Sequence, residues 1–274
     1  MTVAYALGAA RTACVDRLDA QLMLAHLLGQ TRGWLIAHDD VALSAAQSAQ
    51  YAQWLERRRA GEPLAYLLEH TEFCGLVLQV GPQVLIPRPE TELLVDWGLQ
   101  VLAAGFASTS TPSVVDLGCG SGAIALTIRH RCPAATVTAV DASAPALEIA
   151  RRNACALGLP ITLASGDWWS AVAGQRFHVA LSNPPYVAPG DPHLAALHHE
   201  PQSALVAAEQ GLADLHRLID CAHSSLHPGG WLLLEHGHEQ GAAVRLRLRQ
   251  AGFSEVETRC DLAGLERCTG GRVG

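Results

Sequence analysis

The fold is indicated most clearly by one segment, Val114-Val115-Asp116-Leu117-Gly118-Cys119-Gly120-Ser121-Gly122. Its first residues are mostly apolar and β-branched, which is typical of a buried strand. Glycines at every second position then predict a tight turn, and residues 123–131 have the composition of a helix. A strand that enters a helix through a glycine-rich turn is typical of an α/β fold, which binds ligands at the carboxyl ends of its strands.

Strands and helices are expected to alternate along the rest of the C-terminal region. Further strands are predicted at residues 135–141, 161–164, 177–181, 231–235 and 254–260, and helices at residues 145–157, 211–226 and 241–251. A turn is expected at residues 227–230, where Pro228 is followed by two glycines. Repeated strand–helix units predict a doubly wound, mostly parallel sheet.

The N-terminal region is expected to form a small helical domain. Leucines recur at helical spacing in residues 18–28, Gly29 is a stop signal, and Ser44 begins another helix. Residues 73–86 then alternate between apolar and other residues, which predicts a β-hairpin leading into a stiff polar loop at residues 87–92. The predicted parts are a helical domain at residues 1–71, a hairpin and linker at residues 72–90, and a sheet domain at residues 91–274.

The composition and charge of the chain limit the partners, the location and the metal sites that we expect for it. The chain has 274 residues and a net charge of −7, and all 19 of its basic residues are Arg. Because it offers no long basic run, we expect no direct nucleic-acid partner. It has no 18-residue apolar stretch and no basic start followed by an apolar block, so we expect a cytoplasmic protein without a membrane segment, and a monomer. The eight cysteines show no C-x-x-C spacing and the histidines no ligand spacing, so reduced thiols and no metal site are expected.

The glycine segment is the first of three polar motifs that end strands. The backbone from Gly118 to Gly122 (with Cys119, Gly120 and Ser121 between them) can pass close under a ligand. The free N–H groups of the following helix suit an anionic group such as a carboxylate. The spacing is G-x-G-x-G with an acid two residues before it, whereas nicotinamide-binding folds prefer G-x-G-x-x-G. This form resembles the S-adenosylmethionine methyltransferases more closely.

Two further residues are candidates for cofactor contacts. Asp141 ends the next predicted strand, where a carboxylate can accept hydrogen bonds from ribose hydroxyls, although it could instead cap the helix before Pro145. Trp168 and Trp169 follow another predicted strand. An aromatic side chain there could cover an adenine, and core packing is an equal alternative.

The third motif, Asn183-Pro184-Pro185-Tyr186, is the most specific signal in the chain. Two prolines fix the backbone, so an Asn side chain and a fixed carbonyl can both accept hydrogen bonds from one NH₂ group. The flat –C–NH₂ group of glutamine or adenine matches this arrangement, and the Tyr186 ring can flank it. We expect catalytic roles for Asn183, Pro184 and Tyr186, and substrate contacts from all four residues. An ordinary proline-rich turn is the alternative.

With these residues identified, the chain resembles the release-factor glutamine methyltransferases of the HemK/PrmC type over nearly its whole length. The matching segments are Gly61-Glu62-Pro63, residues 85–92, the glycine loop, residues 183–186, Glu200-Pro201, Glu235-His236-Gly237 and residues 261–264. The resemblance implies a seven-stranded class I methyltransferase sheet with S-adenosyl-L-methionine as cofactor and S-adenosyl-L-homocysteine as product.

The resemblance also implies a substrate and a site. Such enzymes methylate the N5 nitrogen of the glutamine in the Gly-Gly-Gln loop of class-1 peptide chain release factors, which supports translation termination. The family's cofactor residues map onto residues 118–122, Asp141, Trp168 and Asn183, and its glutamine site maps onto residues 183–186. The helical N-terminal domain would help to hold the release factor.

Departures from the family pattern are few, and alternatives remain. Cys119 stands where Thr is common, and Glu69 or His70 stands where a Gly usually begins the turn into the hairpin.

Two other enzyme classes are alternatives. A related enzyme methylates a glutamine of a ribosomal protein, and adenine-N6 methyltransferases of DNA or RNA use the same four-residue motif on a flipped base. A cofactor-binding module without catalysis is the third alternative.

Overall fold

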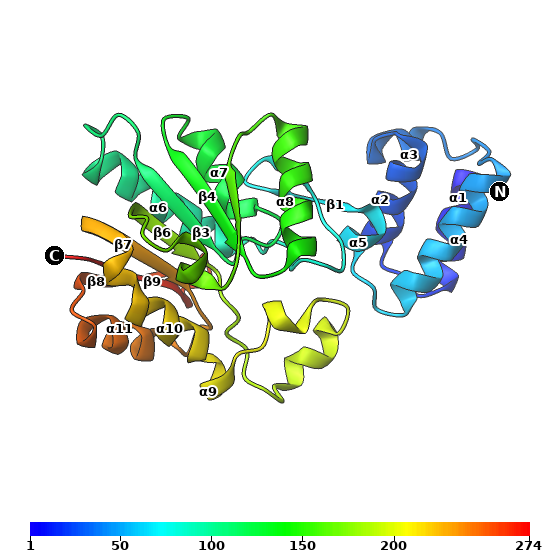
Figure 1. Cartoon of the computed structure of the whole chain (residues 1–274). Helices are drawn as coiled ribbons and strands as arrows, with labels where there is room; N and C mark the ends of the chain where they lie inside the picture. The colour runs from blue at the N-terminus through cyan, green and yellow to red at the C-terminus, as the bar shows by residue number, and fades with distance from the viewer. The chain divides into compact units, whose positions relative to one another are not determined.

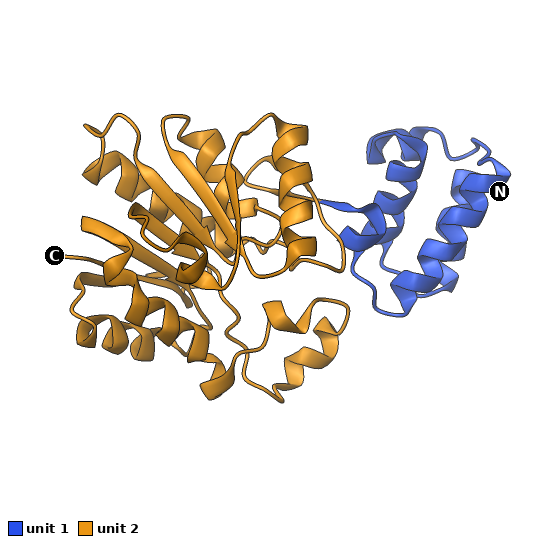
Figure 2. Cartoon of the chain, in the orientation of Figure 1, with its two compact units in different colours: residues 1–70 blue, residues 71–274 orange.

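The computed structural model describes residues 1–274, which form two compact units, residues 1–70 and residues 71–274 (Figure 2). The first unit contains five helices: α1 (Val3–Thr12), α2 (Arg17–Leu28), α3 (Arg32–Ala37), α4 (Ala45–Arg59) and α5 (Leu64–Leu68). The predicted stop at Gly29 is confirmed, because Gly29 has a φ of 62° and caps α2. The predicted start at Ser44 is also confirmed, since Ser44 and Gln47 form a capping box.

The second unit is built on a seven-stranded sheet. Its strands are β3 (Ser113–Leu117), β4 (Thr136–Asp141), β5 (Thr162–Ser165), β6 (Phe177–Ser182), β7 (Leu226–Glu235), β8 (Ser254–Cys260) and β9 (Glu266–Arg272). The strand order is β5-β4-β3-β6-β7-β9-β8. The first five strands are parallel, and β9 pairs antiparallel with both β7 and β8. The predicted doubly wound, mostly parallel sheet is therefore confirmed.

Helices cover both faces of this sheet (Figure 1). One face packs against α6 (Thr91–Gly105), α7 (Ala123–Arg131) and α8 (Ala144–Leu157), and the other against α10 (Ala213–Cys221) and α11 (Gly241–Gln250). Successive strand residues point to opposite faces, so Val114 joins the first cluster of buried residues and Val115 joins the second. Both faces are apolar, which explains the continuous apolar runs in the sequence.

A short hairpin precedes the sheet and is attached to it. Its strands are β1 (His70–Phe73) and β2 (Leu76–Gln79). Asn153 of α8 accepts a hydrogen bond from the Gln79 N–H at 2.6 Å and donates one to the Gln79 carbonyl at 3.0 Å. The buried Asn153 side chain also donates to the Ser121 carbonyl at 2.9 Å, so it links the hairpin to the glycine loop. The hairpin is shorter than the predicted range 73–86.

Two elements differ from the sequence prediction. The predicted helix at residues 211–226 is wrong at its end, because α10 stops at Cys221 and β7 already begins at Leu226. The expected turn at residues 227–230 therefore lies inside β7, opposite an irregularity in its pairing with β6.

The strand β9 carries no apolar alternation in its sequence. Glycine suits position 270, because a Cβ there would crowd Leu233 and Trp97. None of the helices combines the length and apolar character that crossing a membrane requires.

Candidate active site

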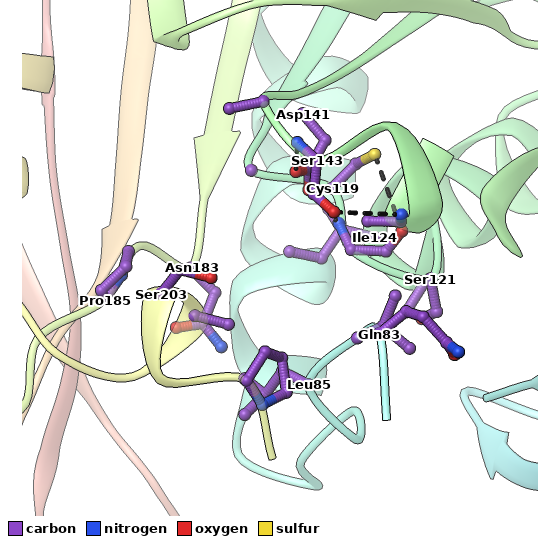
Figure 3. Close-up of a pocket in the computed structure, with 18 of the residues that line it drawn as sticks. Gln83, Leu85, Cys119, Ser121, Ile124, Asp141, Ser143, Asn183, Pro185 and Ser203 are labelled. Carbon is purple, nitrogen blue, oxygen red and sulfur yellow. Dashed lines mark hydrogen bonds between the residues drawn. The ribbon is translucent and has the colours of Figure 1, made fainter. Parts of the chain in front are cut away.

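A cavity of about 470 Å³ lies where β3, β4 and β6 end (Figure 3). This is the edge of the sheet at which open α/β folds bind ligands. Its wall combines segments that are far apart in the sequence. The lining residues include 83–85, Pro87, Thr91, 118–121, 141–143, 166–168, Asn183, Pro185, Pro201, 203–204 and Asp214.

The glycine loop forms one wall of the cavity. Gly118, Gly120 and Gly122 have φ values of 79°, 53° and 82°, in the left-handed region that favours glycine. A Cβ at Gly118 would lie 2.9 Å from the ring of Trp168, so this glycine permits the close approach of backbone and ring. Cys119 and Ser121 lie between the glycines and are buried.

Asp116 connects the end of β3 to the helix that follows the loop. Gly122, the residue before α7, has no side chain, and the Asp116 carboxylate instead accepts the Ala125 N–H at 3.1 Å in the first turn. Burial raises the pKa of Asp116 to about 7. The acid two residues before the first glycine thus stabilises the start of α7.

The structure places Asp141 in the cavity wall at the end of β4. Its carboxylate accepts the N–H groups of Gly120 at 2.9 Å and Ser143 at 2.8 Å. The cap of α8 is Ser143, whose hydroxyl accepts the Ala146 N–H at 3.3 Å. The helix-capping role is thus filled by Ser143, which leaves Asp141 to support the glycine loop and to face a ligand.

The two neighbouring tryptophans have different environments. Trp168 lines the cavity, and its indole N–H donates to Asp214 at 3.3 Å. Trp169 is 7% exposed, packs in the core and donates to the Leu218 carbonyl at 2.9 Å. Core packing therefore describes Trp169, whereas Trp168 is exposed to the cavity and is the one of the two that could contact a ligand there.

Asn183 follows β6 and faces the cavity on the side across from the glycine loop (Figure 3). Its Nδ2 donates to the hydroxyl of Thr91 at 3.2 Å, whereas its Oδ1 is buried and has no hydrogen-bond partner. Pro185 also lines the cavity. Pro184 and Tyr186 are not part of its wall, and Tyr186 packs against the core on the α10–α11 face.

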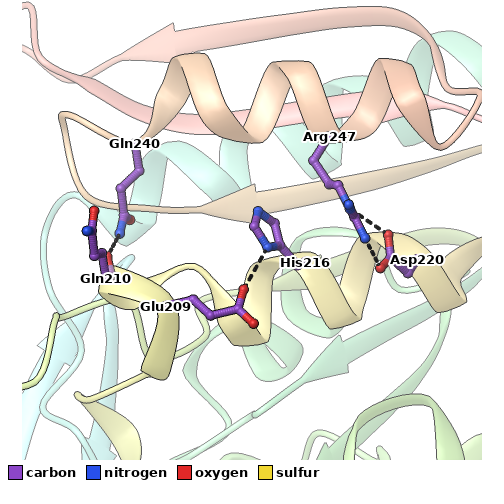
Figure 4. A network of polar contacts seen from close by, with 6 residues as sticks. All are labelled: Glu209, Gln210, His216, Asp220, Gln240 and Arg247. Atoms are coloured by element: carbon purple, nitrogen blue, oxygen red, sulfur yellow. Dashed lines mark hydrogen bonds and ion pairs between the residues drawn. The ribbon is translucent and has the colours of Figure 1, made fainter.

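Tyr186 is held in place by polar contacts at both ends. Its hydroxyl donates to Glu235 at 3.3 Å, and burial raises the pKa of that hydroxyl. Its carbonyl accepts a hydrogen bond from Gln240 at 3.0 Å, and Gln240 also donates to the Gln210 carbonyl at 3.2 Å (Figure 4). These contacts fix the backbone that leaves the Asn-Pro-Pro-Tyr segment.

A buried glutamate joins the two loops that border the cavity. Glu200 is 5% exposed, accepts the Ile86 N–H at 3.1 Å and forms an ion pair with Arg88. It therefore attaches the segment before α6 to the segment after β6. The sequence could not show this pairing, because it joins residues that are 112 positions apart.

Sequence analysis assigned no site role to Thr91, which lines the cavity, or to Glu235, which accepts a hydrogen bond from Tyr186 outside the cavity wall. Thr91 appears in the sequence only as part of a loop before a helix, yet it is buried in the cavity wall beside Asn183. Glu235 ends β7, is 1% exposed, and has a pKa raised to about 7 by burial. A charged residue at the end of an apolar strand was the available signal for Glu235.

The residues of the cavity suit the cofactor that the sequence implies. The glycine loop leaves room for a ligand beside the backbone, Trp168 offers a flat apolar surface, and Asp141 offers a carboxylate. In this sheet only β9 runs antiparallel to the other strands, and it lies next to the edge strand β8. This is the arrangement expected of a class I methyltransferase sheet.

Comparison with known sequences gives the family. The methyltransferase small domain matches residues 92–263, and the PrmC N-terminal domain matches residues 7–68. Release factor glutamine methyltransferase of Burkholderia pseudomallei is 48% identical, over 96% of this chain and 94% of its own length. The Escherichia coli protein of that name is 42% identical, over 93% of this chain and 92% of its own length. The chain belongs to the release factor glutamine methyltransferase family.

Solved structures agree on the fold. A methyltransferase from Pyrococcus furiosus has a TM-score of 0.55 and 19% identity, covering 83% of this chain and 99% of its own. The 16S rRNA N2 G1207 methyltransferase of T. thermophilus has a TM-score of 0.55 and 18% identity, covering 75% of this chain and 50% of its own. At these identities the likeness supports the methyltransferase fold alone.

Proposed function

We propose that this methyltransferase transfers the methyl group of S-adenosyl-L-methionine to the N5 side-chain nitrogen of the glutamine in the Gly-Gly-Gln loop of class-1 peptide release factors. The observation that carries the proposal is the buried Oδ1 of Asn183, which has no partner and belongs to a residue of the cavity wall. A buried acceptor of this kind costs free energy unless a ligand satisfies it. The NH₂ group of a glutamine side chain supplies the donor it lacks. The names of the relatives favour a release factor as the protein that carries this glutamine.

The residues that would hold the cofactor lie on one side of the cavity. The glycine loop would approach its amino-acid part, Asp141 would accept from its ribose, and Trp168 would cover its adenine. Bound there, S-adenosyl-L-methionine supplies an electrophilic methyl group on a cationic sulfur. Asn183 lies across the cavity from the glycine loop, so a substrate nitrogen held by its side chain would face the cofactor side.

The chemical problem is the low nucleophilicity of an amide nitrogen, whose lone pair is delocalised into the carbonyl. Asn183 contributes by accepting one N–H of the substrate, and a carbonyl of the proline-rich segment would accept the other. Holding both hydrogens aims the nitrogen and favours its loss of planarity. One N–CH₃ bond forms as the S–CH₃ bond breaks, and the methylated nitrogen then releases one proton to water. Most of the rate enhancement therefore comes from positioning and electrostatics.

Labelled methyl transfer tests the reaction. The enzyme is incubated with labelled S-adenosyl-L-methionine and a purified release factor, beside a copy of that factor in which the Gly-Gly-Gln glutamine is Ala. We expect label in the first and none in the second. Equal label in both copies would overturn the assigned acceptor. Label in neither, with label appearing in ribosomal protein instead, would assign the enzyme to the ribosomal-protein reaction.

Asn183→Ala tests the role of the unpartnered oxygen. Because this variant removes the acceptor of the substrate NH₂ group, we expect turnover to fall by at least about 100-fold, the loss typical of a transition-state contact. Cofactor affinity should stay within a few-fold of the wild-type value, measured by calorimetry. Unchanged turnover would show that Asn183 does not orient the substrate.

A further inference from the structure

Trp168 is the only aromatic side chain in the cavity wall, and its backbone is strained. Its φ is 50°, in the left-handed region. Bulky residues rarely adopt this conformation, and strained residues persist only where the surrounding structure holds them. The position of the Trp168 ring is therefore imposed by its contacts.

Two contacts hold the indole at opposite ends. The six-membered ring lies against Gly118, where a Cβ would be 2.9 Å from Cζ3 of Trp168. The five-membered ring donates its N–H to Oδ1 of Asp214 at 3.3 Å. Asp214 belongs to the first turn of α10 and lines the same cavity. The end of β3 and the start of α10 thus hold the ring between them.

A second contact joins α10 to the residue before Trp168. Arg217 lies one helical turn after Asp214 and forms an ion pair with Asp167 at 2.5 Å. The two side chains of this pair are 52% and 51% exposed, so the pair contributes little stability. The hydrogen bond from the half-buried Trp168 to the half-buried Asp214 is the more specific contact.

The hydrogen bond to Asp214 selects one orientation of the ring. The χ2 torsion of tryptophan is broad and allows two arrangements related by a flip of the ring. An indole N–H lies in the plane of the ring, so a partner on α10 fixes both the plane and the flip. Without this partner, the N–H would no longer favour one arrangement over the other.

We propose that Asp214 is a positioning residue that holds the Trp168 ring in its ligand-binding orientation before the cofactor arrives. This inference rests on the proposed function, in which Trp168 covers the adenine of S-adenosyl-L-methionine. A ring that is already ordered loses no conformational freedom on binding, so cofactor affinity is higher than for a free ring. Asp214 contributes through the indole N–H and not through its charge.

Calorimetric titration with S-adenosyl-L-homocysteine tests the proposal, because this probe carries the adenine but has no methyl group to transfer. Asp214→Ala removes the acceptor, whereas Asp214→Asn retains an oxygen that can accept and removes only the charge. We expect Kd to rise about 3- to 10-fold in Asp214→Ala, the cost of ordering one side chain on binding, and to stay within about twofold in Asp214→Asn. Arg217→Ala, the control on the same helix, should also stay within about twofold. An equal loss in Asp214→Asn and Asp214→Ala would assign the effect to charge and overturn the proposal.

A double-mutant cycle shows whether Asp214 acts through the indole. Trp168→Phe keeps an aromatic ring but has no N–H to donate. Adding Asp214→Ala to Trp168→Phe should therefore leave Kd unchanged, although the same substitution weakens binding in the wild-type background. Equal losses in both backgrounds would show that Asp214 contributes independently of the Trp168 N–H, and would overturn the positioning role.

Hydrogen exchange of the Trp168 indole N–H, followed by NMR without any ligand, tests whether the ring is held before binding. Its signal is the one of the six tryptophan signals that Trp168→Phe lacks. We expect slow exchange in the wild type and Asp214→Asn, and faster exchange in Asp214→Ala. Equal exchange in all three proteins would overturn the proposal. A wild type that does not bind S-adenosyl-L-homocysteine would overturn the cofactor of the proposed function instead, and the exchange measurement would still decide whether Asp214 holds the ring.

Discussion

Asp141 shows how a single carboxylate can serve both the loop and a ligand. Its two oxygens accept the N–H groups of Gly120 and Ser143, and the residue still lines the cavity. A carboxylate oxygen has more than one acceptor position, so these contacts leave capacity for ribose hydroxyls. The proposed cofactor role and the observed support of the glycine loop are therefore compatible.

Asp141→Ala should weaken cofactor binding by roughly 1–3 kcal/mol, the cost of leaving hydrogen-bonding groups without partners. The variant removes the ribose acceptor and leaves the Gly120 N–H without its partner. Calorimetric titration with the cofactor measures the change. Ser143→Ala is the control, since it alters the cap of α8 but leaves the carboxylate in place. An unchanged Kd in Asp141→Ala would exclude the ribose role.

Glu69 shows how a departure from the family pattern is accommodated. The sequence places Glu69 or His70 where the family usually has Gly, and the structure gives Glu69 a φ of 60° at the end of α5. The left-handed conformation that favours glycine is thus retained by a residue with a Cβ, at a cost of roughly 1–2 kcal/mol. The entry turn of the hairpin survives the substitution.

Glu69→Gly should therefore stabilise the protein by up to about 1 kcal/mol, because relief of strain exceeds the extra entropy of glycine in the unfolded chain. Denaturant unfolding measures the difference. Glu69→Ala is the control, as it removes the same carboxylate but keeps the Cβ, and it should show no such gain. Equal stability of the Gly and Ala variants would contradict the strain argument.

At the scale of elements, the turn before α10 supports the Asn-Pro-Pro-Tyr segment. Glu209, Gln210 and Gly211 have consecutive positive φ values of 55°, 57° and 85°. This left-handed turn brings Gly211 against the Tyr186 carbonyl, with Gln240 joining the two segments. Contacts between α10 and α11, including the Arg247–Asp220 ion pair, hold the same region together (Figure 4).

Gly211→Ala should lower stability by roughly 1–3 kcal/mol and reduce turnover, because a Cβ at this position would overlap the Tyr186 carbonyl oxygen and displace the segment. Thermal unfolding and the methyl-transfer assay measure the two effects. Gly190→Ala provides a matched control, since Gly190 also has a positive φ but a Cβ there would meet nothing. If both variants lose the same activity, backbone strain alone explains the effect.

The helix predicted at residues 211–226 was only partly correct, because α10 ends at Cys221. Periodicity indicated a helix because Leu215, Leu218 and Ile219 lie on one apolar face. Its end could not be found from this pattern, because Ala222 and Leu226 continue the apolar spacing although the chain has already changed direction. Pairing of Leu226 with Phe177 decides where the strand begins, and that is a long-range contact.

At the scale of the whole molecule, buried carboxylates couple stability to pH. Asp116 has its pKa raised from 3.8 to about 7 by burial, so the folded protein retains a proton that the unfolded chain has lost between these values. The stabilising contribution of this group is complete below about pH 4 and is lost as the pH rises through 7.

Asp116→Asn should remove this dependence. The free energy of unfolding of the wild type minus that of the variant should fall by on the order of 2 kcal/mol between pH 5 and pH 8. Denaturant unfolding at several pH values measures it, and taking the difference cancels the other titrating groups. A difference that is constant or rises with pH would show that the Asp116 pKa is not raised in the folded protein.

Sequence alone was enough for the fold class, for the glycine loop, and for the choice of Asp141 and Asn183 as residues at strand ends. Local periodicity and residue chemistry carry that information, and strand ends converge at one edge of a parallel sheet. The family resemblance already pointed to Trp168, but only the tertiary structure showed that Trp169 packs in the core, and that Thr91 and Glu235 adjoin the Asn-Pro-Pro-Tyr segment. These contacts join residues 92 and 49 positions apart. They depend on sheet order and burial, which no local pattern records.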